Sequence, residues 1–364
     1  MSSTWGRQLR LSIWGESHSQ SIGAVLDGLP AGEQIDMEEL LFFMSRRSSQ
    51  GGSLDTPRVE KDYPEIQSGI VNNITCGTPV CAVIHNGNTR SKDYSQLACK
   101  ARPGHADYTG FMRYGGHNDI RGGGHFSGRL TAPLVFAGGL CRQLLARRGI
   151  AIAAHIASIH HVQDTPFPLL GPDKETASRL NRSFFPVLDE VAGQQMRDCI
   201  EAARREQNSV GGVVECALLG LPAGLGDPIF DNVESALSSL LFAIPGVKGV
   251  EFGAGFSISQ MMGSQSNDPF YMKNGSVYTK TNNNGGILGG ITSGMPVIFR
   301  VAFKPTPSIG LPQETVDFVR GENTELTVQG RHDPCIVRRA VPCVEAAVAL
   351  SITDLLLCSQ GGWK

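Results

Sequence analysis

The 364-residue chain is poor in charge, and it lacks the patterns typical of disulfide-linked and membrane-spanning proteins. Charged residues make up 18% of it, against roughly 25% in soluble domains. Nine cysteines are scattered without a C-x-x-C pair, which supports neither a disulfide framework nor a zinc site. No uninterrupted apolar run reaches about 18 residues, and the N-terminus has no signal-peptide core. The sequence therefore predicts a cytoplasmic protein that binds no membrane.

The overall balance of residues narrows the class of partner. A net charge of −2 gives no reason to expect nucleic acid or an anionic membrane. Low charge beside 41% hydrophobic residues indicates that much of the surface is covered, so we expect a homo-oligomer. The 44 glycines exceed the usual share of roughly 7% and predict many tight turns and close backbone approaches.

Helix and strand signals alternate along the chain without a low-complexity linker. This alternation favours one α+β domain that covers residues 1–364, with long glycine-rich loops. Capping boxes (Asp36 with Glu39, and Asp231 with Glu234) open two of the expected helices. We expect helices at about 37–44, 131–145, 186–206, 236–243 and from Pro342 to 357, and strands at 9–14, 150–159, 213–219 and 297–303.

One short stretch, Gly330–Cys335, places a cation, an imidazole and a carboxylate side by side before a proline. It lies between a polar loop and a long apolar run, where burial can tune pKa values for proton transfer. Asp333 is therefore a candidate proton carrier. An Arg–Asp ion pair that fixes a turn explains these six residues equally well.

Two further loops hold candidate proton carriers. His18 ends the segment Gly15-Glu16-Ser17-His18 at the mouth of an expected strand, although a lone histidine is more often structural. His105 lies in Arg102-Pro103-Gly104-His105-Ala106-Asp107, where proline stiffens a loop that also carries a cation and a carboxylate. No third ligand follows at zinc-like spacing, so a metal is not favoured.

A third loop, Arg121–Arg129, carries three successive glycines and enters an expected helix. Backbone N–H groups there can approach a ligand closely, and a helix start favours an anion. No Lys-Ser/Thr pair follows the glycines, so this is not the nucleoside-triphosphate loop. The turn at 304–308 offers an ammonium and two hydroxyls. Arg46, Arg47 and Arg58 add cations that a solvated surface would also explain.

These loops supply several cations and three proton carriers, but no nucleophile with an adjacent base, no metal set and no triphosphate loop. This inventory fits proton-coupled elimination from a phosphorylated, acidic small molecule. The residues alone do not identify that molecule.

In the same order and spacing, these loops resemble the chorismate synthase family over essentially the whole chain. The resemblance rests on the segments G-E-S-H, R-P-G-H-A-D, G-G-G-x-x-S-G-R-x-T, K-P-T and G-R-H-D-P-C, and on Val247–Glu251 and Gly285–Gly290. It implies a β-α-β sandwich and a homotetramer. It also implies conversion of 5-enolpyruvylshikimate 3-phosphate to chorismate by 1,4-anti elimination of phosphate, with reduced FMN.

The resemblance also implies roles for single residues. His18 would protonate the leaving phosphate, His105 would govern the protonation of the reduced flavin, and Asp333 would be the base near its N5. The residues implied to contact FMN are His125, Phe126, Ser127, Gly289, Lys304, Pro305, Thr306, Pro307, Ser308 and Arg331. Those implied to hold phosphate and carboxylates are Arg47, Arg58 and Arg129, and Arg47 is also a candidate for contacting NADPH.

The sequence also bears on the source of electrons for the flavin. Ser53 stands where some members of the family have a second nucleotide-contacting arginine. The chain also shows no added reductase domain, which favours a separate flavin reductase over NADPH bound by this chain. Rival interpretations are a flavin-dependent oxidoreductase acting on another anionic molecule and a non-catalytic flavin- or RNA-binding protein. The acidic balance argues against RNA.

Overall fold

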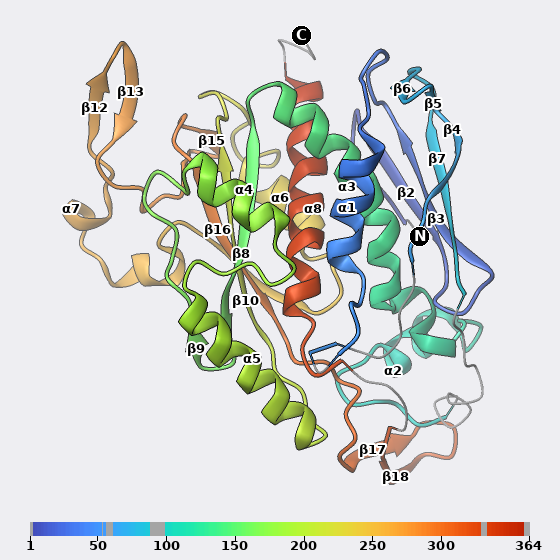
Figure 1. Ribbon diagram of the computed structural model, residues 1–364. Coiled ribbons are helices and arrows are strands. Elements are labelled where there is room, and N and C mark those ends of the chain that lie inside the picture. The colour runs from blue at the N-terminus through green and yellow to red at the C-terminus, as the bar shows by residue number, and fades with distance from the viewer. Residues whose placement is uncertain (1–2, 53, 56–60, 88–98, 329–332, 360–364) are drawn as a thin grey trace.

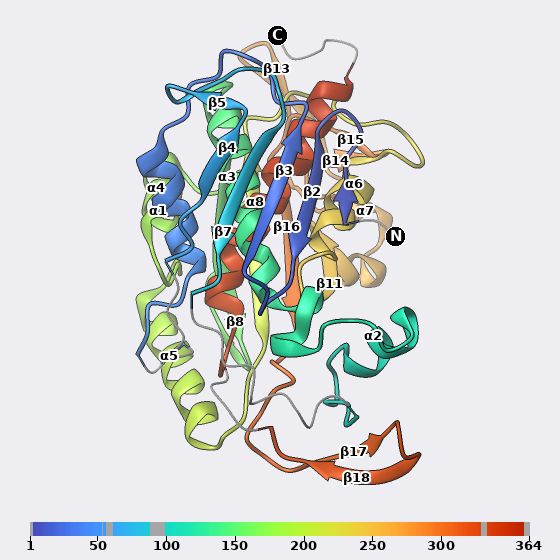
Figure 2. The same cartoon turned by 90° about the vertical axis from the view of Figure 1, so that its right-hand side faces the viewer.

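The computed structural model describes residues 3–52, 54–55, 61–87, 99–328 and 333–359. Two five-stranded antiparallel sheets enclose a layer of helices (Figures 1 and 2). This arrangement confirms the predicted α+β class and its β-α-β order. The first sheet has the order β1-β2-β3-β7-β4, formed by Thr4–Trp5, Arg10–Gly15, Ser21–Asp27, Val80–His85 and Glu65–Ser68. The second has the order β11-β16-β10-β8-β9, formed by Val247–Phe252, Val297–Phe303, Gly212–Leu219, Ala151–Ile159 and Val162–Gln163.

The helical layer consists of α1 (Met37–Arg47), α3 (Thr131–Arg147), α6 (Val233–Leu241) and α8 (Val337–Cys358). Helix α3 packs on the first sheet and α8 on the second, and the two helices pack on each other. The two helices approach each other closely at Gly138. A Cβ added there would lie 2.3 Å from the Cβ of Ala346. Glycine at this position therefore allows the close approach of α3 and α8.

Strand alternation places one face of each sheet on the helices. In β16 the side chains at 297, 299, 301 and 303 are buried in the main core, whereas those between them are half-buried. Burying each such side chain contributes about 1.5–3 kcal/mol. Helix α4 (Lys174–Arg182) covers the other face of the second sheet, where Ala153, Ala217 and Leu180 form a smaller cluster. The second sheet is therefore covered on both faces.

Helix α8 is long and apolar enough to cross a membrane by length and composition. Most of it is buried between the two sheets, as in the core helix of a globular protein. Our expectation that the helix follows Pro342 is wrong, because it begins at Val337 and contains this proline. Inside a helix, proline removes one backbone donor and its ring crowds the carbonyl four residues earlier, which costs about 3 kcal/mol. Burial of α8 in the helical layer offsets this cost.

Two other predicted helix starts differ from the structure. Helix α5 (Glu190–Arg205) begins at the N-cap Asp189 rather than at Pro186. Helix α6 is capped by Asn232, whose side chain accepts from the N–H of Ser235 at 2.6 Å, rather than by Asp231. The carboxylate of Asp231 instead pairs with Arg7 at 2.8 Å. The starts of α1 and α3 and the core strands β8, β10 and β16 agree with prediction to within one residue.

The remaining elements are short or peripheral. They are β5 (Ile70–Val71), β6 (Ile74–Thr75), α2 (Asp107–Tyr114), α7 (Gly263–Ser266), β12 (Phe270–Lys273), β13 (Ser276–Thr279), β14 (Ile287–Leu288), β15 (Ile291–Thr292), β17 (Gln313–Asp317) and β18 (Glu322–Leu326). Turns η2 (Arg121–Phe126), η3 (Gly128–Leu130) and η4 (Gly255–Gln260) are 3₁₀. Helix α2 and the β17–β18 hairpin lie at the end of the sandwich where α3 and α8 begin (Figures 1 and 2).

Candidate functional site

A cavity of about 640 Å³ lies at this end of the helical layer. Its volume is within the range that small-molecule and cofactor sites span, roughly 300–1,000 Å³. The last turn of α1, the first turns of α3 and α8, the end of β16 and the loop before α2 all contribute to its walls. Segments far apart in the sequence therefore meet there.

The charge of this cavity is strongly unbalanced. Among the described residues, six cationic side chains line it, whereas Asp333 is the one lining carboxylate. The cations are Arg47, Arg102, Arg129, Lys248, Lys304 and Arg339. Two further carboxylates, Asp62 and Asp107, stand behind the wall and pair with three of the arginines. A formal excess of three positive charges remains, which suits an anionic ligand.

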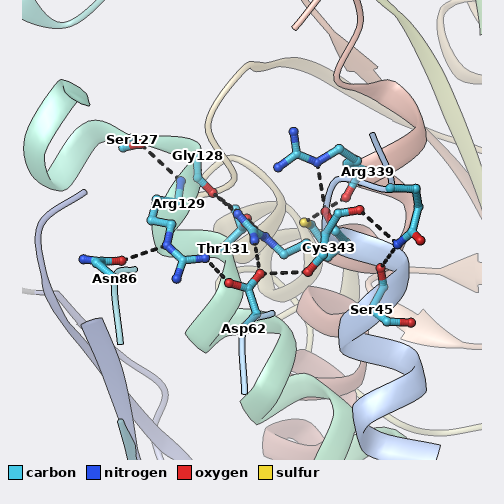
Figure 3. Close-up of polar contacts among 12 residues, drawn as sticks. Ser45, Asp62, Asn86, Ser127, Gly128, Arg129, Thr131, Arg339 and Cys343 are labelled. Carbon is cyan, nitrogen blue, oxygen red and sulfur yellow. Dashed lines mark hydrogen bonds and ion pairs between the residues drawn. The ribbon is translucent and has the colours of Figure 1, made fainter. Parts of the chain in front are cut away.

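Asp62 is shared by two of the arginines, and Figure 3 shows its contact with Arg129. Its carboxylate accepts from Arg47 at 2.5 Å and also pairs with Arg129. Burial alone would raise the pKa of Asp62, but the charges of Arg47 and Arg129 and their hydrogen bonds hold it below its usual value. Burial lowers the pKa of Arg47, and the charge of Asp62 offsets this only in part. The carboxylate thus fixes both guanidinium groups at the cavity wall.

His105 lines the cavity and is held from behind by a carboxylate. Its Nδ1 lies 2.7 Å from Asp107 Oδ1 and 3.0 Å from Arg102 Nη2. The guanidinium can only donate and the carboxylate can only accept, so Nδ1 serves one of them at a time. The closer Asp107 favours a proton on Nδ1. Burial alone would raise the pKa of Asp107, but the hydrogen bonds from Arg102 and His105 lower it well below its usual range.

His18 is buried directly behind the cavity wall. A Cβ added at Gly122 would lie 2.7 Å from His18 Nε2, and Gly122 itself lines the cavity. The backbone of Gly122 has a φ of +61°, a region that favours glycine. The next glycine approaches His105 in the same way, since a Cβ at Gly123 would lie 3.2 Å from His105 Nε2. The predicted glycine loop thus brings the two histidines to one place.

Asp333 lines the cavity from the segment before α8. Both of its carboxylate oxygens lie 3.0 Å from Arg339 Nη1, and the hydroxyl of Thr306 donates to its backbone carbonyl at 2.6 Å. Asp333 therefore forms an ion pair in the site with Arg339, a residue outside the stretch 330–335. The Arg–Asp pair that the sequence suggested within this stretch stays a prediction. Arg331 and His332 lie outside the described residues.

The predicted turn at 304–308 forms part of the wall with all five residues. The ammonium of Lys304 donates to the Gly104 carbonyl. Burial and the nearby charge of Lys248 lower the pKa of Lys304. Ser308 accepts from Arg102 at 3.1 Å, which ties the turn to the loop that carries His105.

The remaining predicted residues divide into three groups. His125, Phe126 and Ser127 line the cavity, but both ring nitrogens of His125 already bond, to Gly15 O and Ser3 Oγ at 2.8 Å each. Gly289 is not among the lining residues, because it lies in the β14–β15 turn beside the start of α6. Arg58 lies outside the described residues. The roles given to Gly289 and Arg58 stay predictions.

Sequence reasoning missed Asp62, Lys248 and Arg339 as site residues. One signal was available for Arg339. It lies in the first turn of α8, where the helix dipole disfavours a cation, so a partner or ligand was to be expected there. Asp62 carries no comparable signal, because its pairing depends on a contact with Arg129, 67 residues away.

An α+β fold whose electropositive cavity joins an imidazole and a carboxylate has the make-up of an enzyme for anionic small molecules. Comparison with known proteins identifies the class. The family model described as chorismate synthase matches residues 9–357. The chain therefore belongs to the chorismate synthase family, lyases of the shikimate pathway.

Individual relatives match along nearly their whole length. The protein named chorismate synthase in Dehalococcoides mccartyi (strain BAV1) is 47% identical over 357 residues, which cover 98% of this chain and 97% of that protein. Its namesake in Thermococcus gammatolerans is 47% identical and covers 97% of both chains. A crystal structure titled chorismate synthase superposes with a TM-score of 0.77 at 28% identity, covering 98% of this chain and 94% of that one.

Proposed function

We propose that this protein converts 5-enolpyruvylshikimate 3-phosphate to chorismate and phosphate by 1,4-anti elimination, with reduced FMN as the cofactor. One observation carries the proposal. The cavity joins the proposed proton carriers His105 and Asp333 to an excess of positive charge, with His18 directly behind its wall. Family membership supplies the reaction class, and the charge of the cavity suits a substrate with a phosphate and two carboxylates.

The anion is held by two means. Arginines 47, 102 and 129 are fixed by carboxylates behind the wall, so they need no reorganisation when an anion binds. Helices α3 and α8 both begin at the cavity without a side-chain hydrogen bond at their caps. The positive ends of both helix dipoles therefore lie at the cavity, where they favour an anion.

The proton carriers have separate tasks in this proposal. His18 donates a proton to the leaving phosphate from behind Gly122. His105, with its Nδ1 proton held by Asp107, presents Nε2 to the cavity and sets the protonation of the bound flavin. Asp333 accepts the ring proton, while Arg339 orients its carboxylate by donating to both oxygens.

The cavity fits a flavin mononucleotide together with a substrate. One side is apolar, formed by Phe242, Ile244, Val247, Phe303 and Ile336, and can pack on a flat ring system. Lys248 and Lys304 stand nearby as a like-charged pair that a phosphate would neutralise. When bound, the reduced flavin supplies an electron-rich ring that lends charge as the phosphate leaves.

The test is phosphate release under anaerobic conditions with reduced FMN and the phosphorylated substrate. We expect turnover without net flavin oxidation. Asp333→Asn and His105→Ala should each lower kcat by about 10²–10⁴-fold, the usual contribution of a general acid or base. Asp173→Asn is the matched control, because asparagine also caps a helix well.

The outcomes separate the alternatives. No phosphate release by the unaltered protein would refute the proposed reaction, and stoichiometric flavin oxidation would favour an oxidoreductase. If both variants stay within a few-fold of the unaltered protein, the residue roles are wrong even though the reaction stands.

We further propose that a separate reductase supplies the reduced flavin. The guanidinium of Arg47, the candidate NADPH contact, is already bonded to Asp62, to Thr131 Oγ1 at 2.9 Å and to the Gly128 carbonyl at 3.1 Å. These bonds use three of its five N–H donors, and in this proposal the other two serve the anionic substrate rather than a nucleotide. Turnover in air with NADPH and no added reductase would overturn this assignment.

We also propose a homotetramer, because the low charge content predicts a homo-oligomer and the family resemblance implies four subunits. Large apolar side chains are exposed between residues 229 and 288, with Phe230 and Phe256 exposed by 86% and 85%. The β12–β13 hairpin in the same region projects from the body (Figure 1). Exposed apolar groups of this size indicate an interaction surface. Light scattering should give four times the mass of the chain, and a monomer would exclude the assembly.

A further inference from the structure

A turn on the second sheet carries two histidines in succession. Strands β8 and β9 pair through Ile159 and Val162, so His160 and His161 are the two residues of a hairpin loop. His160 has a φ of +52°, which costs energy for a residue other than glycine. Such loops favour Asn-Gly, Asp-Gly or Gly-Gly. The turn itself therefore gives no reason for two imidazoles.

These imidazoles face a thiol on a neighbouring helix. The Nδ1 atoms of His160 and His161 lie 2.7 Å apart, and the rings are edge-to-face at 77°. Helix α5 packs beside β9 and supplies Cys199. The two imidazole nitrogens and the Cys199 sulfur all lie within 4.8 Å of one another. Within the described part of the chain, this is the one group of three or more histidine, cysteine or acidic residues with metal-binding spacing.

We propose that His160, His161 and Cys199 form a binding site for one transition-metal ion of the zinc class. Imidazole and thiolate are the ligands that Zn²⁺ prefers. With Zn–N of about 2.0–2.1 Å and Zn–S of about 2.3 Å, tetrahedral ligand atoms stand roughly 3.3–3.6 Å apart. The observed separations bracket that range. Both histidines are exposed and Cys199 is partly so, which lets small side-chain rotations close the site and leaves a fourth position for water.

The site is separate from the cavity but connected to it by backbone. None of its three residues lines the cavity. The N–H of His160 donates to the Gly211 carbonyl at 3.0 Å, and the N–H of the adjacent Val210 donates to the Pro334 carbonyl at 2.9 Å. Pro334 follows Asp333. A bound metal would therefore stabilise the corner of the fold that supports Asp333 without entering the reaction.

The experiment is a titration of the full-length, tag-free, chelator-treated protein with Co²⁺, followed by competition with Zn²⁺. We expect one equivalent to bind, with a thiolate-to-cobalt charge-transfer band. Cys199→Ser should abolish this band. Cys199→Ser and His160→Asn should each weaken binding at least roughly tenfold, because even the loss of a residue behind a ligand costs about that much. Asparagine tolerates the backbone conformation of residue 160, so the turn should be kept.

Two controls make the result decisive. Cys76→Ser removes an exposed thiol in the loop between β6 and β7 and should change nothing. In the unaltered protein, Zn²⁺ should slow alkylation of Cys199 but not of Cys76, a measurement that does not depend on the folding of a variant. The proposal is overturned if no equivalent of Co²⁺ binds, if the band persists in Cys199→Ser, or if Zn²⁺ leaves the alkylation of Cys199 unchanged.

Discussion

Arg46 and Arg47 are neighbours in the last turn of α1, yet they belong to two different buried ion-pair regions. Arg46 turns into the core and forms a bidentate pair with Glu345 of α8 at 2.8 and 3.0 Å. The two side chains are 1% and 0% exposed. Arg47 turns to the cavity and shares Asp62 with Arg129. Adjacent residues on a helix point in different directions, so one sequence feature serves two regions.

The difference between the regions is charge balance. In the core, one cation meets one carboxylate and no charge is left over. At the cavity, two guanidinium groups share one carboxylate, and further cations stand in the same wall. A balanced buried pair fixes the packing of two helices. An unbalanced set of charged side chains beside a cavity is neutralised when an anionic ligand binds.

The largest effect should come from breaking the balanced pair. Glu345→Gln leaves the guanidinium of Arg46 buried without a counter-charge, and such losses cost about 3–5 kcal/mol. Denaturant titration should show this decrease in the free energy of unfolding, with KM unchanged in the folded fraction.

The matched control is the double variant Arg46→Met with Glu345→Leu. It removes both charges and fills similar volume, so it should recover most of the lost stability. A double variant as unstable as Glu345→Gln would show that the pair does more than balance charge.

A smaller loss, about 1–3 kcal/mol, should follow Asp62→Asn, because the cavity admits water to the unpaired guanidinium groups. Asp62 has a φ of +46°, which asparagine tolerates, so the change is confined to charge. Added inorganic phosphate should stabilise Asp62→Asn more than it stabilises the unaltered protein, since the anion replaces the missing charge.

The same titration distinguishes the two regions. Phosphate should stabilise Glu345→Gln no more than it stabilises the unaltered protein. The missing carboxylate charge of this variant lies in the buried core, where phosphate cannot reach it. Potassium chloride at equal ionic strength is the control for screening. If phosphate rescues both variants equally, the contrast between core and cavity is wrong.

The smallest effect concerns a third buried set, in which His155 lies between Asp164 at 2.9 Å and Glu215 at 3.0 Å. Burial alone would lower the pKa of His155, but hydrogen bonds and charges from both carboxylates raise it above 6.5. Its contribution to stability is therefore complete below about pH 6.5 and is lost as pH rises through the folded pKa. The slope should be at most about 1.4 kcal/mol per pH unit.

The pH dependence of stability that Asp164 contributes has the opposite sign. Despite burial, the hydrogen bond to His155 lowers the folded pKa of Asp164 below 3.8. The contribution of Asp164 to stability is complete above pH 3.8 and is lost as pH falls through the folded pKa.

The test of His155 is denaturant titration at a series of pH values. The free energy of unfolding should decrease above about pH 6.5, and His155→Gln should abolish this decrease. An unchanged slope in that variant would remove His155 as the cause.

Local signals predicted the elements whose ends carry their own chemistry. Asp36 caps α1 as expected, accepting from the N–H groups of residues 38 and 39. The alternation in Val297–Phe303 matches β16. Prediction failed where tertiary packing outweighs a local signal. Pro342 usually marks a helix start, but burial of α8 between two sheets tolerates it inside the helix.

The candidate site was predictable where its chemistry is contiguous. Clustered polar residues beside proline indicate the loops that carry His105 and Lys304 in the sequence. Both loops line the cavity. Asp62 could not be found in this way, because its function arises from partners at positions 47 and 129. The spacing of residues along the sequence does not reveal such a long-range contact.

By itself the sequence determined the fold class, the family and the residue types available for chemistry, because motif order, capping and alternation are local properties. Only the tertiary structure decided which charges are balanced. It turned Arg46 into the core and Arg47 to the cavity, paired Asp333 with Arg339, and placed Gly122 over His18. Electrostatic function depends on distance and burial, and these are fixed only when remote segments pack together.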